Sequence, residues 1–316
     1  MCTAITIGKY AGRNLDIEIS YGESVIITPK NCRLTFKNTD DIEEHYAIIG
    51  VGTVKDGYPL YYDAANEHGI YAAGLNYVGY AKYHEQHKAK INLAPYEIIP
   101  YILSTCRNVS EAKSKLENVN IVGVPFSREL PAAELHFFIA DKESSLTVES
   151  DENGLNVYEN TPGVLSNNPS FPMQMHNLTN YVGLTNGPLV NRLSDALKPR
   201  AYSRGMGALG LPGDLSSESR FVRAVFHKLN YVYSGNPCDI FHLLSTVEMP
   251  DGSLKLGDLY ERTEYSSGVD LENLIYYFRT YSSASCRAVK LFSEDIHSSS
   301  LISYALNTPE KIVFLN

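Results

Sequence analysis

Hydrophobic and polar residues alternate in short runs through the first half of the chain, with turn residues between the runs. Thr3–Ile7 alternates and is followed by Gly8-Lys9, which is typical of a tight turn. Arg13–Ile19 alternates again, with odd-numbered residues on one face of the expected strand and even-numbered residues on the other. The pattern predicts an N-terminal hairpin, followed by strands at Glu23–Ile27, Tyr46–Val51 and Ile70–Leu75.

Helical spacing of apolar residues begins further along the chain. It covers Pro95–Cys106, where proline suits a first turn, and Ser110–Leu116, where Ser110 is predicted to be the N-cap. Later helices are predicted at Met173–Tyr181, Ser219–Leu229 and Cys238–Val247, and later strands at Leu135–Ala140, Leu146–Glu149, Leu155–Tyr158, Tyr265–Val269, Leu274–Arg279 and Ala288–Leu291. This order, with no linker or repeat, predicts one α+β domain over residues 1–316.

The composition narrows the choice of partners. The chain has 316 residues, 44% of them hydrophobic, and its 36 acidic and 27 basic residues give a net charge of −9. No block of Lys and Arg stands out, so neither nucleic acid nor an anionic membrane is expected as a partner. The first residues lack the features of a signal peptide, and no apolar run approaches the ~18 residues of a membrane span. We therefore expect a cytoplasmic protein.

The cysteines and histidines give little sign of a metal site. Five scattered cysteines form no CxxC pair, which argues against a disulfide framework or a cysteine zinc site. His84 and His87 lie three residues apart in polar surroundings, without an HExxH motif or a carboxylate–histidine cluster. We expect neither a metal nor a cofactor.

Cys2 is the one cysteine whose position suggests chemistry. Its side chain is small enough for Met1 to be removed by an aminopeptidase, which would leave a residue with both a thiol and a free α-amine. A free α-amine has an unperturbed pKa near ~8, so such a residue would contain a nucleophile and its own base. Position alone favours the ordinary alternative, in which Cys2 is simply a residue near a start codon.

Other polar residues have ordinary interpretations when each is taken alone. Arg13 and Asp16 fit a surface ion pair, Asn76 fits a turn at a strand end, and Arg220 fits a solvated charge in the first turn of a helix. Ser166–Pro169 fits a loop. The glycine-rich run Gly205–Gly213 lacks the Gly-Lys-Ser/Thr ending of a phosphate loop and is better explained as a tight turn or a mobile loop.

Taken together, these segments resemble one family. The resemblance extends over nearly the whole chain, in order, through MCTA at the N-terminus, GRNLDIEISYGE (Gly12–Glu23), YPLYYDAANEHGIYAAGLN (Tyr58–Asn76), PGVLSNNPSF (Pro162–Phe171), SRGMGALGLPGDLSSESRFVRA (Ser203–Ala224), FHLLSTVE (Phe241–Glu248) and IYYFRTY (Ile275–Tyr281). The chain resembles the choloylglycine hydrolase family, which contains bile salt hydrolases and penicillin V acylases.

This resemblance implies a fold and a set of roles. The family is similar to other N-terminal nucleophile hydrolases and has a four-layer αββα sandwich. Cys2 would be the nucleophile after removal of Met1, and its α-amine would carry the proton. The other implied catalytic residues are Asp16 on that amine, Arg13 near the thiolate, Asn76 and Asn167 in the oxyanion hole, and Arg220 completing the polar cluster. The reaction would be attack on a secondary amide, release of the amine and hydrolysis of a thioester.

Within the family, Asn76 after Gly74-Leu75 resembles the bile salt hydrolases, and Ser203-Arg204-Gly205 resembles members that accept taurine conjugates. The resemblance places Leu15, Phe126, Leu130 and Leu135 in an apolar steroid pocket, although an ordinary core role is equally expected for each. Together with Ser203 and Arg204, these residues form the predicted substrate-binding set. We expect a gut bacterial hydrolase of glycine- and taurine-conjugated bile acids, which the resemblance implies is a homotetramer.

Three other interpretations stay open: a penicillin V acylase, an N-acyl homoserine lactone acylase, and an inactive relic that only binds bile acids. The last is suggested by the interval from Cys2 to Arg13, which is several residues shorter than is usual in the family. A tighter hairpin turn would preserve the register of the two strands. A slipped register would instead turn Arg13 and Asp16 away from Cys2.

Overall fold

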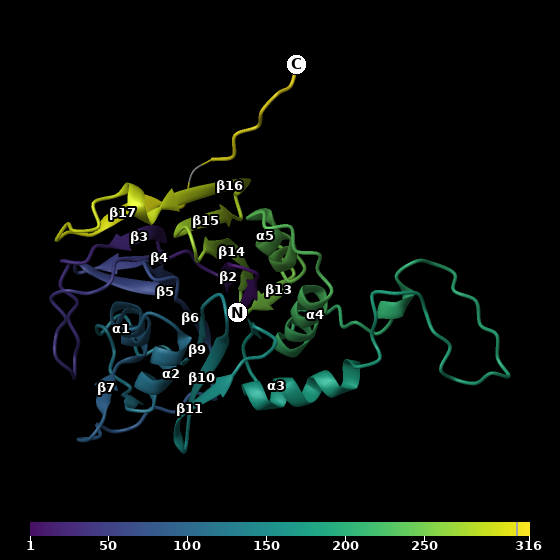
Figure 1. Ribbon diagram of the computed structural model, residues 1–316, viewed down its shortest axis with the longest axis horizontal. Coiled ribbons are helices and arrows are strands. Elements are labelled where there is room, and N and C mark those ends of the chain that lie inside the picture. Colours follow the sequence, from purple (N-terminus) through teal and green to yellow (C-terminus); the bar gives the residue numbers. More distant parts are fainter. Residues whose placement is uncertain (308) are drawn as a thin grey trace.

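Two antiparallel sheets lie face to face at the centre of the molecule (Figure 1). The structure is a computed structural model, and it describes residues 1–307 and 309–316. The first sheet has the order β12 (Val164–Leu165), β1 (Cys2–Ile7), β2 (Tyr10–Ile17), β14 (Leu259–Asp270), β15 (Ile275–Thr280) and β16 (Ser283–Lys290), with β13 (Leu254–Leu256) paired to β14. The second has the order β11 (Gly154–Glu159), β10 (Ser145–Asp151), β9 (Leu135–Ala140), β6 (Tyr71–Asn76), β5 (Tyr58–Asn66), β4 (Ile48–Lys55), β3 (Ser24–Thr28) and β17 (Ile302–Ala305).

Helices cover the outer face of each sheet. The second sheet packs against α1 (Ile98–Thr105) and α2 (Val109–Leu116), and the first sheet packs against α4 (Ser217–Leu229) and α5 (Cys238–Ser245) (Figure 1). The remaining elements are β7 (Ile91–Leu93), β8 (Val119–Ile121), α3 (Phe171–Asn177) and the short 3-10 helices η1 (Pro95–Glu97), η2 (Leu178–Tyr181), η3 (Met206–Ala208) and η4 (Leu291–Ser293). The predicted αββα sandwich is confirmed.

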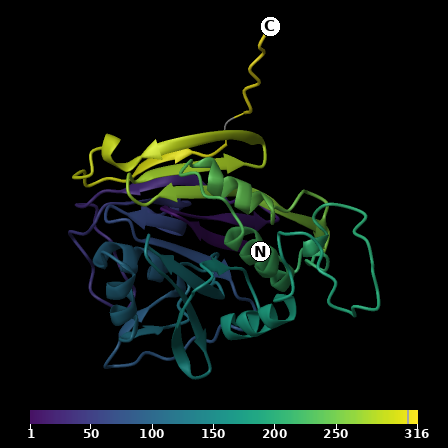
Figure 2. The same cartoon turned by 45° about the vertical axis from the view of Figure 1, so that its right-hand side comes forward.

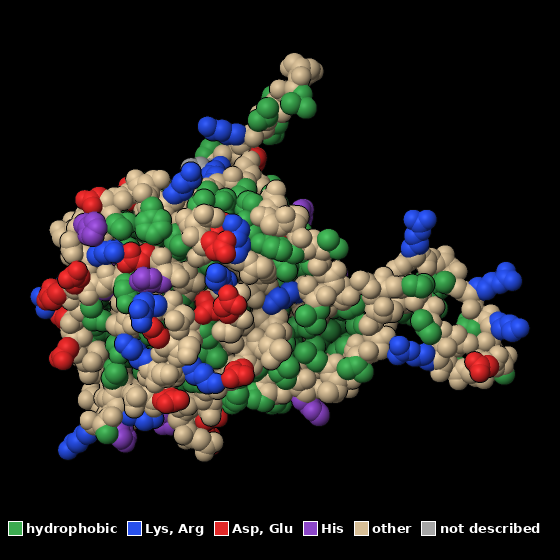
Figure 3. Space-filling view, in the orientation of Figure 1, with side chains coloured by type: hydrophobic (Ala, Val, Ile, Leu, Met, Phe, Trp, Pro, Cys, Tyr) green, Lys and Arg blue, Asp and Glu red, His purple; other side chains and the backbone are tan. Residues whose placement is uncertain are grey.

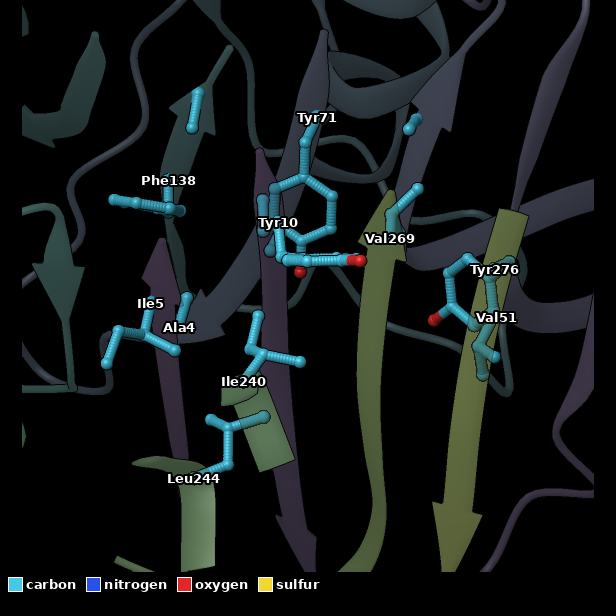
Figure 4. Packing of buried hydrophobic residues seen from close by; sticks show 14 of the residues in the cluster. Ala4, Ile5, Tyr10, Val51, Tyr71, Phe138, Ile240, Leu244, Val269 and Tyr276 are labelled. Carbon is cyan, nitrogen blue, oxygen red and sulfur yellow. The ribbon is translucent and has the colours of Figure 1, made fainter. Parts of the chain in front are cut away.

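The core between the sheets joins residues from both ends of the chain. The cluster that forms it, part of which Figure 4 shows, includes Ala4 of the first sheet and Tyr71 and Phe138 of the second. The cluster continues on the outer face of the first sheet with Tyr10 and with Ile240 of α5. A second cluster lies between the second sheet and α1 and α2. Because both faces of each sheet are covered, several strands are buried along most of their length rather than alternating between core and solvent.

The N-terminal hairpin has the predicted turn and a regular register. Gly8 adopts a φ of +53°, which favours glycine, at the tight turn before Lys9. Cys2 pairs with Leu15 and Ala4 pairs with Arg13. The short interval therefore shortens the turn without a slip in register. Arg13 points to the same face of the sheet as Cys2, because directly paired residues share a face. Asp16 points to the opposite face.

Several details of the sequence-based prediction are wrong. The strand predicted at Arg13–Ile19 begins at Tyr10 and ends at Ile17. The cap of α2 is Asn108 rather than Ser110, and its side chain accepts the N–H of Glu111. The helix predicted at Pro95–Cys106 is divided into η1 and α1, and strand β5 was not predicted. Strands with a clear alternation of apolar and polar residues were easier to predict than strands that are buried on both faces and lack that alternation.

One long loop extends away from the rest of the domain. This excursion, as the loop is called below, lies between η2 and α4, includes η3, and is drawn in teal and green at the right of Figure 1 and Figure 2. Basic side chains are spread along it in Figure 3, and the exposed ones are Arg192, Lys198, Arg200 and Arg204. Among the helices of the described residues, none is both long and apolar enough to cross a membrane.

Candidate active site

Cys2 lies at the start of β1 and is held from two sides. Its side chain is buried, and its backbone N–H donates to Oδ1 of Asn167 at 2.8 Å. Its carbonyl oxygen accepts a hydrogen bond from Nη1 of Arg220 at 2.6 Å. Asn167 comes opposite Cys2 because β12 runs antiparallel to β1, with Leu165 paired to Ala4 two residues earlier. Two residues that lie far away in the sequence therefore fix the backbone of the candidate nucleophile.

Arg13 brings a positive charge between the sheets, on the Cys2 face. Its Nη1 donates to the carbonyls of Tyr62, at 2.9 Å, and Gly74, at 2.6 Å, in the second sheet. Its Nη2 is buried and has no hydrogen-bond partner among the described residues. Burial by itself would lower the pKa of Arg13, but Cys2 and nearby acidic groups raise it above the usual value. The surface ion pair that Arg13 suggested in isolation is wrong, because the residue is fully buried.

Asp63 supplies a counter-charge near Arg13, and sequence analysis did not single it out. This fully buried carboxylate accepts hydroxyl groups of Tyr265 (2.5 Å), Tyr276 (2.7 Å) and Ser267 (3.0 Å), and a longer bond from Tyr71. Burial raises the pKa of Asp63, while Arg13 and these hydroxyl groups oppose the rise. The only signal in the sequence was a lone aspartate within the apolar strand that contains it.

Asp16 lies on the opposite face of β2 and is also fully buried. Its Oδ1 accepts the hydroxyl of Thr263 at 2.6 Å, and its Oδ2 lies 3.9 Å from Nη1 of Arg220. Within the described residues, no hydrogen-bond donor reaches that Oδ2 atom. An unfilled carboxylate oxygen in a buried site can accept a further N–H group, such as an α-ammonium.

The α-ammonium group of Met1 is held beside this cluster by two contacts. The group contacts the carboxylate of Glu261 and donates to the carbonyl of Asp16 at 2.5 Å. Burial lowers the pKa of this α-amine, against the opposing effects of Cys2 and Asp16. While Met1 is present, the nitrogen of Cys2 is an amide and has no basic lone pair, so it cannot take a proton.

Arg220 connects these groups from helix α4. The helix begins with Ser216 as its cap, which accepts the N–H of Ser219 and sets the first turn over β1. Besides its bond to Cys2, Arg220 donates to the hydroxyl of Thr3 at 2.5 Å and to Oδ1 of Asn167 at 2.7 Å. The residue is fully buried, so the interpretation as a solvated charge is wrong. Burial lowers the pKa of Arg220, while Asp16 and Cys2 raise it.

The two expected oxyanion donors differ in their availability. Asn167 uses its Nδ2 to donate to the carbonyl of Asn76 at 2.7 Å, and its backbone N–H donates to the hydroxyl of Ser217 at 2.7 Å. Asn76 ends β6 with an exposed side chain, whose amide makes no hydrogen bond to any described residue. The amide of Asn76 is therefore free to meet an oxyanion, whereas Asn167 must first exchange a partner.

The predicted substrate-binding residues fall into two groups. Leu15 is paired with Cys2, and Leu135 is paired with Asn76 across β6 and β9. Phe126 packs its ring against Tyr58 and Tyr96, and its N–H donates to the carbonyl of Leu130, in the loop that precedes β9. Ser203 and Arg204 are exposed in the excursion before α4, and no described contact joins them to Cys2. The role of both groups as substrate-binding residues stays a prediction.

No metal-binding group of three or more His, Cys, Asp or Glu residues occurs within residues 1–307 and 309–316. Nε2 of His84 instead contacts the carbonyl of Asp151 at 2.8 Å.

The chemistry that the arrangement around Cys2 allows is thiol chemistry. A buried thiol shares a face with a guanidinium group, its backbone is fixed at both polar atoms, and an unfilled carboxylate lies close to its chain terminus.

Comparison with known proteins gives a consistent result. Residues 2–304 match the linear amide C–N hydrolases of the choloylglycine hydrolase family. The chain is 45% identical, over all of both chains, to a bile salt hydrolase/transferase of Lactiplantibacillus plantarum. It is 37% identical to a conjugated bile acid hydrolase of Lactobacillus gasseri, with 96% of this chain and 100% of that protein aligned.

Solved structures agree with the fold. A mutant of the conjugated bile acid hydrolase from Clostridium perfringens superposes with a TM-score of 0.93 at 34% identity, and all of both chains is covered. A penicillin V acylase from Agrobacterium tumefaciens gives a TM-score of 0.76 at 19% identity, over 97% of this chain and 92% of that one. At that identity the second likeness concerns the fold alone.

Proposed function

Because the chain belongs to the choloylglycine hydrolase family of linear amide C–N hydrolases, we propose that it hydrolyses the amide bond of glycine- and taurine-conjugated bile acids with Cys2 as nucleophile. The observation that carries this proposal is the hairpin register, which places Arg13 on the Cys2 face despite the short turn. Its relatives named as bile salt or conjugated bile acid hydrolases support the substrate class. The enzyme is thus an amidohydrolase.

Removal of Met1 is the first step of the proposed mechanism. It breaks the contacts of Met1 with Glu261 and Asp16 and converts the amide nitrogen of Cys2 into an amine. That nitrogen already lies against Oδ1 of Asn167. The free Oδ2 of Asp16 is available to accept one of the new N–H bonds. Both contacts would orient the amine so that its lone pair faces the thiol.

The thiol of Cys2 then gives its proton to this amine, and the guanidinium of Arg13 stabilises the thiolate. The thiolate attacks the carbonyl carbon of the amide, and the resulting oxyanion accepts the Nδ2–H of Asn76. As the C–N bond breaks, the protonated amine of Cys2 passes its proton to the leaving glycine or taurine. Water, deprotonated by the same amine, attacks the thioester, which releases the bile acid and restores the thiol.

Replacing Asn76 with alanine tests the oxyanion assignment. We expect kcat to fall by about 10²-fold, because one donor to the developing charge is lost. Stability should change by no more than about 0.5 kcal/mol, because the side chain is exposed and unpaired within the described chain. Kinetics and thermal unfolding on the same preparation measure both. Asn180→Ala, at another exposed asparagine, is the control, and equal turnover by the two variants would contradict the assignment.

Parallel assays of four substrates test the substrate class: glycocholate, taurocholate, penicillin V and an N-acyl homoserine lactone. We expect free glycine and taurine to appear much faster than the products of the other two. Faster cleavage of penicillin V or the lactone would assign the protein to the corresponding acylase. Binding of glycocholate without release of glycine, by protein lacking Met1, would instead indicate an inactive bile-acid-binding protein.

We also propose that residues 1–316 form a single domain, since the core between the sheets combines residues from both ends of the chain. The cytoplasmic location, expected from the sequence, and the homotetramer, implied by the resemblance, stay predictions. Size-exclusion chromatography with light scattering tests the tetramer directly, and a monomer in solution would contradict it.

A further inference from the structure

A buried histidine and a buried glutamate lie side by side, next to the segments that contain the two asparagines of the site. His136 of β9 and Glu149 of β10 are neighbours across adjacent strands, since Val148 pairs with Phe137 one position away. Both are almost completely removed from solvent. They point toward the first sheet, because Phe138 on the same face as His136 belongs to the core between the sheets.

Both imidazole nitrogens of His136 face acceptors. Nε2 lies 2.9 Å from the carbonyl of Ser166, so it must carry a hydrogen and donate it. Nδ1 lies 3.2 Å from Oε1 of Glu149. Glu149 is itself held in place, because its Oε1 also accepts the N–H of Phe171 at 2.9 Å. Glu149 therefore orients the ring so that Nε2–H is directed at Ser166.

The carbonyl that His136 binds belongs to the same peptide unit as the N–H of Asn167. At its other end, this peptide donates to the hydroxyl of Ser217. His136 thus fixes the peptide at its oxygen, and a hydrogen bond to a carbonyl also strengthens the N–H of the same amide as a donor. Asn167 is in turn the residue that holds the nitrogen of Cys2.

The same ring supports the second asparagine. Tyr77 follows Asn76 in the sequence, and its ring stacks on His136 with centroids 4.4 Å apart and planes at 7°. Burial and the nearby Glu149 raise the pKa of Tyr77, so its hydroxyl stays protonated. One imidazole therefore contacts the neighbours of both asparagines that the site presents to an oxyanion.

We propose that His136, oriented by Glu149, is a positioning residue that holds Ser166–Asn167 and Asn76–Tyr77 in the geometry needed to stabilise the oxyanion. The inference rests on the proposed amide hydrolysis and adds a residue to its machinery. His136 touches neither Cys2 nor Arg13 through any described hydrogen bond. Arg220 holds Oδ1 of Asn167 without help from His136, so loss of His136 should slow the attack on the amide while leaving the thiolate in place.

Kinetics of His136→Leu and His136→Gln with glycocholate test this proposal. Leucine removes the donor to Ser166, and we expect kcat to fall by about tenfold or more, with KM within about threefold of wild type. The amide nitrogen of glutamine can reach the position of Nε2, so His136→Gln should recover a large part of kcat. Alkylation of Cys2 by iodoacetamide needs no oxyanion hole and should proceed at the wild-type rate in both variants.

Ile139→Ala is the matched control, because Ile139 lies on the same strand but faces α1 and α2. It should lower the melting temperature and leave kcat unchanged. Unchanged kcat in His136→Leu would overturn the proposal. A parallel loss of kcat and alkylation, or glutamine performing no better than leucine, would also overturn it, because either result indicates a general structural role.

If His136→Leu does not fold, Glu149→Gln takes its place, with the same two readouts and the same criteria of lowered kcat and retained alkylation. Failure of the proposed function would be seen separately, as no release of glycine by the wild-type protein. In that case this inference falls with it. Failure of the inference alone would be seen as equal turnover by an active wild type and its folded variants.

Discussion

Replacing Cys2 with alanine is expected to lower the release of glycine from glycocholate by roughly 10⁴-fold or more, since no other group can form the thioester. The fold should persist, because the removed sulfur is small and the backbone contacts of Cys2 with Asn167 and Arg220 do not involve the side chain. The measurement is steady-state turnover, with circular dichroism and thermal unfolding on the same sample.

Cys106→Ala is the control for this prediction. Cys106 is also buried, but it lies in the cluster beneath α1 and far from the hairpin in the sequence. It should retain full turnover with a small loss of stability. Cys2→Ser keeps the α-amine and should retain only a trace of activity. Substantial hydrolysis by a folded Cys2→Ala protein would rule out Cys2 as the nucleophile.

Replacing Arg13 with leucine is expected to have the second largest effect, with turnover about 10²-fold lower. Loss of the guanidinium removes the positive charge that stabilises the thiolate, so alkylation of Cys2 at pH 7 should also slow. Stability should fall by about 3 kcal/mol, because the partly buried carbonyls of Tyr62 and Gly74 lose their donor and the buried Asp63 loses a nearby cation.

Two further variants separate charge from structure. Arg13→Lys keeps the charge and loses part of the hydrogen bonding, so it should alkylate faster than Arg13→Leu. Arg223→Leu is the matched structural control, since Arg223 is a buried arginine of α4 that donates to the carbonyls of Pro212 and Asp214. It should lose stability without a comparable loss of alkylation. Equal alkylation rates for wild type and Arg13→Leu would exclude the proposed role.

The hairpin shows what the sequence could predict. Alternation and the Gly8-Lys9 turn were sufficient to pair the first two strands, and this pairing brings Cys2 and Arg13 to one face. The ordinary interpretation of Asp16 as a surface charge implied that its side of β2 meets solvent. It does not, because α4 and α5 cover that side, and helices that arrive more than 200 residues later leave no trace in the local pattern.

The buried network illustrates a second limit. Arg13, Asp16 and Arg220 were recognised by resemblance, while their individual patterns indicated surface charges. Asp63 and His136 had no pattern at all, since each is a single polar residue in a strand that otherwise pairs and packs normally. Their partners lie in the other sheet or on a strand that is adjacent only after folding. Such residues can be recognised only from the folded structure, in which their hydrogen-bond partners lie next to them.

The central claim is that the acyl group of the substrate is carried by the thiol of an N-terminal Cys2. The most direct test is to quench the reaction with glycocholate in acid within the first turnover and to analyse the N-terminal peptide by mass spectrometry. We expect a peptide that begins at Cys2, without Met1, and that carries the bile acyl group on its sulfur. An active protein that retains Met1, or an acyl group found on another residue, would contradict the account.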